Sequence, residues 1–254
     1  MSATTLGAAA DQQYDVRGED VYRVGSGAPT SRVAYSGEQR LMVERDGAGT
    51  RFDAQASYTR DADGVKRRVD ARFVQELLPD GAFEDRIDDD PDFLTILNQP
   101  FAVRLDGITL RDLQNLRAPV PFDASSPLGG RDVLRGYLRP APPGKICGRP
   151  VVAVAFEAEG PMTAPMPTRL SATMSGRMRM QGTAYYALGD AMLLALDATL
   201  TIVAHLHEGA HVTPVRVVYR RFIRAAVPSP APAAKTPPPT PLPTGGGTAS
   251  PPTP

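Results

Sequence analysis

The chain has 254 residues, with 28 basic and 28 acidic side chains that leave a formal net charge of zero, and it contains no tryptophan. Because it has no block of basic residues to attract a phosphate backbone, it is not expected to bind nucleic acid. Cys147 is its one cysteine, which excludes an internal disulfide and a cysteine-based zinc site. No apolar run is long enough to cross a bilayer as a helix, so no transmembrane segment is expected.

The two ends of the chain differ from its middle. Residues 1–14 are expected to be a flexible segment, in which Gly-Ala-Ala-Ala at residues 7–10 resembles the cleavage site of a signal peptide. Residues 227–254 are mainly Pro, Ala, Thr, Ser and Gly, which predicts a disordered tail. Residues 15–226 are then a single β-rich domain. It is periplasmic or secreted if a signal is missing upstream, and otherwise cytoplasmic.

The first half of this domain predicts an antiparallel meander. Apolar residues recur at every second position in residues 33–43, 52–58 and 69–77, which is the period of strands with one buried face. Turn-forming residues at 46–49 and 61–64 separate these segments. Three strands joined by hairpins are therefore expected.

The middle of the domain breaks this alternation. Apolar residues at helical spacing predict short helices at residues 93–97 and 110–116, with a short strand at 101–105 between them. The acidic run at residues 84–92 lacks the ligand spacing of an EF-hand calcium loop. We interpret its end, Asp90 followed by Pro91, as the cap and first residue of the first helix.

The second half returns to strands after a Pro-rich loop at residues 119–127. Strands are predicted at 133–138 and 151–159, and three more in residues 170–223, where one face is apolar and the other polar. Met and Leu side chains on the apolar face could line an adaptable cavity for an apolar ligand, although filling of an ordinary core explains them as well. The candidate ligand-binding residues are Met174, Met178, Met180, Met192, Leu194 and Leu196.

The three histidines, His205, His207 and His211, suggest a metal site, because residues two apart on a strand share a face. A two-residue turn is predicted at 208–209. This turn places His211 opposite Leu206 on the inner face, whereas His205 and His207 point outward. The three imidazoles then converge only if a bulge shifts the register.

Two segments resemble a known family. Residues 144–150, Gly-Lys-Ile-Cys-Gly-Arg-Pro, with the strand at 151–157, and the hairpin at 185–194 resemble strand pairs of bacterial lipoprotein-carrier-like proteins. The resemblance implies a long antiparallel sheet folded into an incomplete barrel, closed by helices and holding acyl chains. It implies no ligand-contact residue at any particular position.

These patterns together predict a mainly β protein: a curved antiparallel sheet or incomplete barrel, with two short helices in the middle of the chain. No nucleophile elbow, Walker loop or dinucleotide fingerprint occurs, so no enzymatic activity, catalytic residue or cofactor is expected. The function expected first is binding of a lipid or other apolar small molecule in a bacterial envelope. One alternative is a structural or protein-interaction module with a filled core. Another is a metal-dependent hydrolase using the three histidines.

Overall fold

The computed structural model describes residues 9–27, 30–45, 50–78, 83–88, 110–126, 132–165, 172–188 and 192–226. In these ranges the chain forms one antiparallel sheet and one short helix. The elements in chain order are β1 (Ala9–Val24), β2 (Ser31–Arg45), β3 (Thr50–Ala62), β4 (Val65–Leu77), β5 (Phe83–Asp88), α2 (Leu110–Asn115), β6 (Val120–Ser125), β7 (Val133–Pro140), β8 (Gly144–Ile146), β9 (Arg149–Pro165), β10 (Ala172–Ala187), β11 (Leu193–Glu208) and β12 (His211–Ala225).

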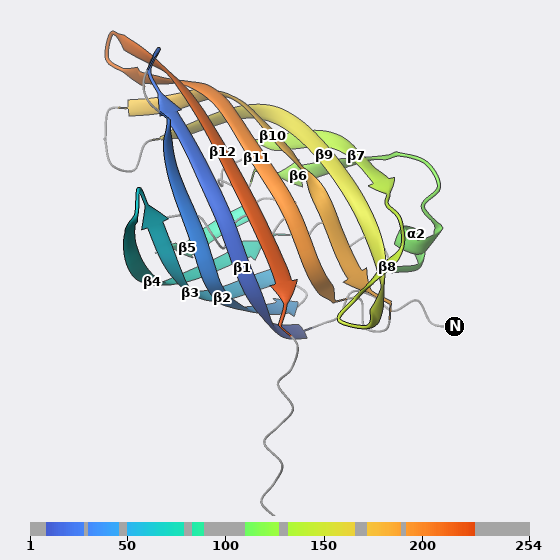
Figure 1. The fold of residues 1–254 in the computed structure, drawn as a ribbon. Coiled ribbons are helices and arrows are strands. Elements are labelled where there is room, and N and C mark those ends of the chain that lie inside the picture. The colour runs from blue at the N-terminus through green and yellow to red at the C-terminus, as the bar shows by residue number, and fades with distance from the viewer. Residues whose placement is uncertain are drawn as a thin grey trace, which may run out of the picture.

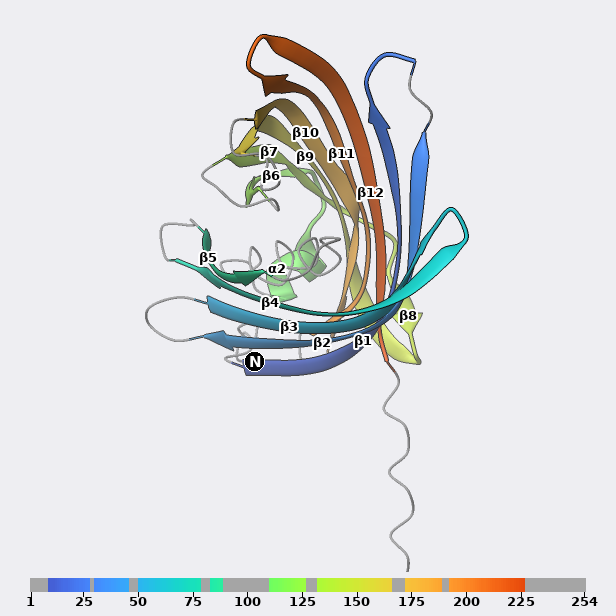
Figure 2. The ribbon, with the colours of Figure 1, turned by 90° about the vertical axis from the view of Figure 1, so that its left-hand side faces the viewer.

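The sheet has 12 strands, and its order is β5-β4-β3-β2-β1-β12-β11-β10-β9-β7-β6, with β8 paired to β9 beside this path. Neighbours in the sheet are mostly neighbours in sequence, as in a meander. There are two exceptions: the first long strand, β1, pairs with the last, β12, and β7 pairs with β9 because β8 lies beside the path. The strands bend into a deep curve that has a concave and a convex face (Figures 1 and 2). The described strands do not close the curve, because β5 and β6 form its two edges.

Alternate residues of each long strand lie on opposite faces of the sheet. The concave face carries one continuous cluster of buried apolar side chains. The convex face carries charged side chains that pair across neighbouring strands. Arg72 Nη2 lies 2.6 Å from Asp53 Oδ2, and Arg177 Nη2 lies 2.9 Å from Glu159 Oε1. The expected division into an apolar and a polar face is therefore confirmed.

Glycines on the concave face let neighbouring backbones approach closely. A Cβ on Gly182 of β10 would lie 1.9 Å from the carbonyl oxygen of Asp197 and 2.6 Å from Cζ of Phe156, which occupies the space beside the glycine. A Cβ on Gly37 of β2 would lie 2.3 Å from the carbonyl oxygen of Ser57. Glycine within a strand is typical of such bends and close approaches. These residues therefore permit the strong curvature of the sheet.

The prediction of two short helices in the middle of the chain is not confirmed. Within the described residues there is one helix, α2, and it spans only 6 residues. It occupies the second predicted segment, 110–116, except for its last residue, so this one of the two helices is confirmed. Pro119 follows closely and disfavours helical geometry at Ala118. The predicted helix at 93–97 and strand at 101–105 lie outside the described residues.

Two strands occur where loops or flexible chain were expected. β1 begins at Ala9, inside the segment expected to be flexible, and its residues pair on both sides, with β2 and β12. β6 lies within the predicted Pro-rich loop and contains Pro121. Proline is tolerated there because β6 is an edge strand, where a backbone N–H need not join the ladder.

Among the described residues, no helix has both the length and the apolar character needed to cross a membrane.

Candidate functional site

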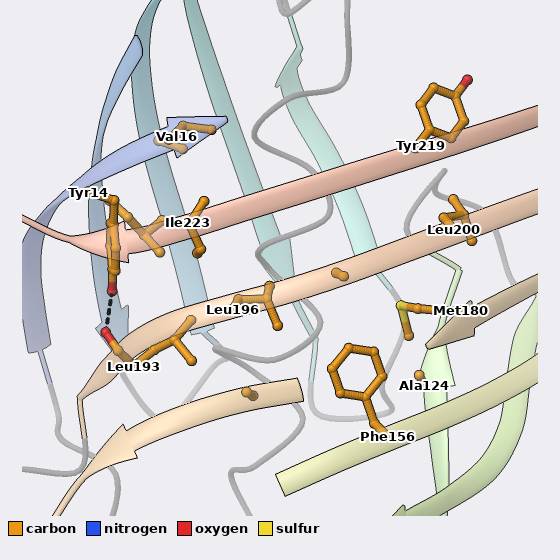
Figure 3. Close-up of a cluster of buried hydrophobic side chains, with 14 of the residues drawn as sticks. Tyr14, Val16, Ala124, Phe156, Met180, Leu193, Leu196, Leu200, Tyr219 and Ile223 are labelled. Atoms are coloured by element: carbon orange, nitrogen blue, oxygen red, sulfur yellow. Dashed lines mark hydrogen bonds between the residues drawn. The ribbon is translucent and has the colours of Figure 1, made fainter. Parts of the chain in front are cut away.

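The concave face is the main candidate for a binding surface, and its side chains are almost completely buried. Figure 3 shows Tyr14, Leu193, Leu196 and Ile223 grouped at one end of this face. The hydroxyl of Tyr14 donates a hydrogen bond to the carbonyl oxygen of Leu193, at 3.0 Å. This bond satisfies a buried polar group and ties β1 to the start of β11, across β12.

The structure divides the six predicted ligand-binding residues into two sets. Met178, Met180, Leu194 and Leu196 are 0 to 2% exposed and belong to the buried cluster of the concave face. Met174 and Met192 are partly buried and pack against the same cluster from opposite ends of the β10–β11 pair. All six therefore contact one apolar region, although Met178 and Met180 have almost no accessible surface to offer a ligand.

A buried ion pair, which the sequence did not predict, interrupts this apolar face. Asp20 of β1 and Arg221 of β12 are both 0% exposed, and Arg221 Nη1 donates to Asp20 Oδ1 at 2.5 Å. The Arg221 side chain lies over Gly18, where a Cβ would come within 3.0 Å of Nη1. The glycine therefore makes room for the guanidinium inside the sheet.

Aromatic side chains complete this polar cluster. The hydroxyls of Tyr22 and Tyr35 each donate to Asp20 Oδ2 at 2.9 Å. The guanidinium carbon of Arg221 lies 5.1 Å from the ring centre of Tyr35 and 5.5 Å from that of Tyr219, distances typical of cation–π contacts. A carboxylate with several donors and a cation between two rings is a well-compensated buried pair.

Burial changes the ionisation of the groups in this cluster. It raises the pKa of Asp20, while the positive charge of Arg221 acts in the opposite direction. Burial, with the negative charge of Asp20, raises the pKa of Tyr219 to about 12 and raises the pKa of Tyr22 as well. The phenols are therefore protonated near neutral pH, which is the state in which Tyr22 can donate its hydroxyl hydrogen to Asp20.

An open pocket lies between α2 and the beginning of β9. Its volume is about 480 Å³, and it is lined mainly by apolar side chains, including Leu113 and Leu116 of the α2 region, Val151, Val152 and Leu188. Leu113 is 4% exposed and also belongs to the buried cluster of the concave face. Arg117 also lines this pocket. It donates hydrogen bonds to the carbonyl oxygens of Gln114, in α2, and of Leu116, just after α2.

Described residues on the convex face line three other pockets. Charged and polar side chains make up much of their lining, unlike the lining of the pocket at α2. The pocket between β9, β10 and β11, for example, is lined by Arg139, Glu157 and Asp197. The pocket at α2 has the volume and the apolar lining of small-molecule sites in proteins. Leu188 lies in it, so the pocket adjoins the end of β10, which pairs with the beginning of β11.

The histidines do not meet. The two-residue turn is at Gly209 and Ala210, one residue later than predicted, because Glu208 pairs with His211. Gly209 has a φ of 60°, which favours glycine at the first turn position. His211 therefore lies opposite Glu208, and the predicted pairing of His211 with Leu206 is wrong, because Leu206 pairs with Thr213. The faces are nevertheless as expected, with His205 and His207 on the convex face and His211 on the concave face. Among the described residues, no three His, Cys, Asp or Glu side chains are grouped to hold a metal ion.

The structure describes two other segments noted in the sequence, the second of them in part. Cys147 is exposed and lies in the tight turn between β8 and β9, with a φ of 50°. The first part of the acidic run, residues 84–88, lies in the edge strand β5. Asp90 and Pro91, the predicted cap and first helical residue, lie outside the described residues.

No protein-family model matches the chain, and no curated protein matches it.

Proposed function

We propose that this protein binds an apolar or lipid-like small molecule without catalysing a reaction. The observation that carries the proposal is the apolar pocket of about 480 Å³ where α2 meets β9. This pocket shares Leu113 with the buried cluster of the concave face. A ligand seated in it would extend apolar packing that already exists.

The arrangement of the sheet supports the same proposal. The edge strands β5 and β6 do not pair with each other, and α2 lies in the stretch of chain that connects them. A sheet with free edges can widen without losing hydrogen bonds between its strands. The concave face then admits a ligand too large for the pocket alone. Met174 and Met192, which are partly buried, would contact such a ligand first.

We further propose that binding takes place in a bacterial envelope. This rests on the resemblance of residues 144–157 and 185–194 to lipoprotein-carrier-like strand pairs and on the cleavage-like residues 7–10. Fractionation of cells that naturally produce the protein would test it. Recovery with the cytoplasmic fraction would contradict it.

The competing function is a protein-interaction module whose concave face is a filled core. The burial of Met178 and Met180, at 1% and 0% exposure, favours this alternative. The two functions differ in what the pocket at α2 does. In a carrier it holds a ligand, and in a module it is a surface depression.

A binding experiment with the full chain separates the two. A fluorescent fatty acid is titrated into the protein, the Leu116→Trp variant and the Val203→Trp variant. Leu116 lines the pocket, whereas Val203 is 56% exposed on the convex face, so the second variant controls for an added indole. For a carrier, we expect about tenfold weaker binding in Leu116→Trp only. Absence of saturable binding to the unmodified protein would contradict the proposal.

A further inference from the structure

Two histidines lie together on the convex face, away from the proposed ligand pocket. His205 and His207 are two residues apart in β11, so their side chains leave the same face of the strand. Their ring centres are 6.5 Å apart, and the ring planes are tilted by 54°. Two imidazoles bound to one ion at metal–nitrogen distances of about 2 Å stand closer than this, so the exposed ring of His205 turns toward His207 when both bind. His205 is exposed and His207 is partly buried, so both can be reached from solvent.

We propose that His205 and His207 together bind a divalent transition metal ion on the convex face, at the β11–β12 hairpin. This site is separate from the proposed ligand pocket and does not depend on it. It also differs from a three-histidine centre, because the strand alternation places His211 on the opposite face.

Ser175 of the neighbouring strand β10 supports this geometry. Its Oγ lies 3.0 Å from Nε2 of His207. Metal-binding histidines commonly donate their second ring N–H to an oxygen atom, which fixes the tautomer and the ring orientation. When Nε2–H donates to Ser175 Oγ, the lone pair of His207 is on Nδ1, the nitrogen that then binds the metal. Ser175 is thus a positioning residue.

The donor set selects the metal. Neutral imidazoles suit Cu²⁺, Ni²⁺ and Zn²⁺, and the general order of affinities places Cu²⁺ above Zn²⁺. Ca²⁺ and Mg²⁺ require several oxygen ligands, and the described residues place no carboxylate-rich group here. With two protein ligands on an exposed face, the remaining coordination positions are filled by water, so the ion exchanges readily.

The test uses the full chain, freed of metal with a chelator and titrated with Cu²⁺ in a calorimeter. The variants are His205→Ala, His207→Ala and the double variant, with His211→Ala as the matched control. His211 is 4 residues from His207 but on the other face. We expect one equivalent of Cu²⁺, bound at least about tenfold more weakly when either His205 or His207 is removed. His211→Ala should stay within about twofold of the unmodified protein.

Two further measurements show whether the bound Cu²⁺ has imidazole ligands and whether the variants fold. Electron paramagnetic resonance of the Cu²⁺ complex should show coupling to two imidazole nitrogens, and the signal should be lost in the double variant. Circular dichroism of the metal-free variants checks that they fold, which their position on the outer face favours. The proposal is overturned if the unmodified protein binds no more tightly than the double variant, or if His211→Ala weakens binding as much as His205→Ala.

Discussion

At the scale of single residues, the buried Asp20–Arg221 pair is the least expected feature of this protein. The two side chains are separated by 201 positions in the sequence, and they meet only because the first and last long strands of the sheet pair. Asp20 lies at an inward position of a strand, a place where the hydrophobic pattern alone predicts an apolar residue. Its partner depends on long-range topology, so no local signal could have identified it.

Removing one member of this pair should be costly. Asp20→Ala leaves the Arg221 guanidinium buried without its carboxylate, and breaking a buried pair in this way costs about 3 to 5 kcal/mol of unfolding free energy. Replacing both residues, as in Asp20→Leu with Arg221→Met, should recover most of that loss. Urea denaturation of the single and double variants measures it. A double variant no more stable than Asp20→Ala would show that the pair has a role beyond charge compensation.

The hydroxyl of Tyr35 should contribute more to stability than that of Tyr14. Tyr35 donates to the carboxylate of Asp20, whereas Tyr14 donates to a neutral carbonyl oxygen. Hydrogen bonds to charged groups contribute about 1.5 to 3 kcal/mol, against about 0.5 to 1.5 for neutral pairs. We therefore expect Tyr35→Phe to lower the free energy of unfolding more than Tyr14→Phe. Equal losses in chemical denaturation would contradict this assignment of the two bonds.

At the scale of the elements, the sequence predicts the strands better than the connections. Alternation of apolar and polar residues identifies β2, β3, β4, β10, β11 and β12, because each buries one face. It fails for the beginning of β1, where Asp11, Gln12 and Gln13 carry no apolar pattern and pairing with β2 decides the conformation. It also fails for β6, where Pro121 indicates a loop unless the edge position is known.

The curvature of the strands depends on glycine at the concave face. In Gly182→Ala the new methyl group would meet the carbonyl oxygen of Asp197, and such overpacking costs about 1 to 3 kcal/mol. Gly144→Ala is the matched control, since a Cβ at Gly144 has no atom within 4 Å. Thermal denaturation should show a lower Tm for Gly182→Ala and little change for the control. The same Tm in both variants would exclude a structural role for the close approach at Gly182.

At the scale of the whole molecule, the chain separates its two faces by chemistry. The convex face carries ion pairs between neighbouring strands, beside some exposed apolar side chains such as Val203 and Phe222, and the concave face carries buried apolar side chains with one buried polar cluster. The sequence predicts which residues share a face, including the six candidate ligand residues. It does not predict that the accessible apolar pocket lies at α2, because Leu113, Val152 and Leu188 come together only when the helix packs against β9.

The central claim, that this fold holds an apolar ligand, is tested most directly by what the protein carries when purified. The full chain would be produced in a bacterial expression host, purified without detergent and extracted with organic solvent. The lipid in the extract would be measured by mass spectrometry against the protein concentration. We expect one lipid class at near-stoichiometric amounts. An extract free of lipid, from a folded protein that also fails to bind an added fatty acid, would contradict the claim and favour a module with a filled core.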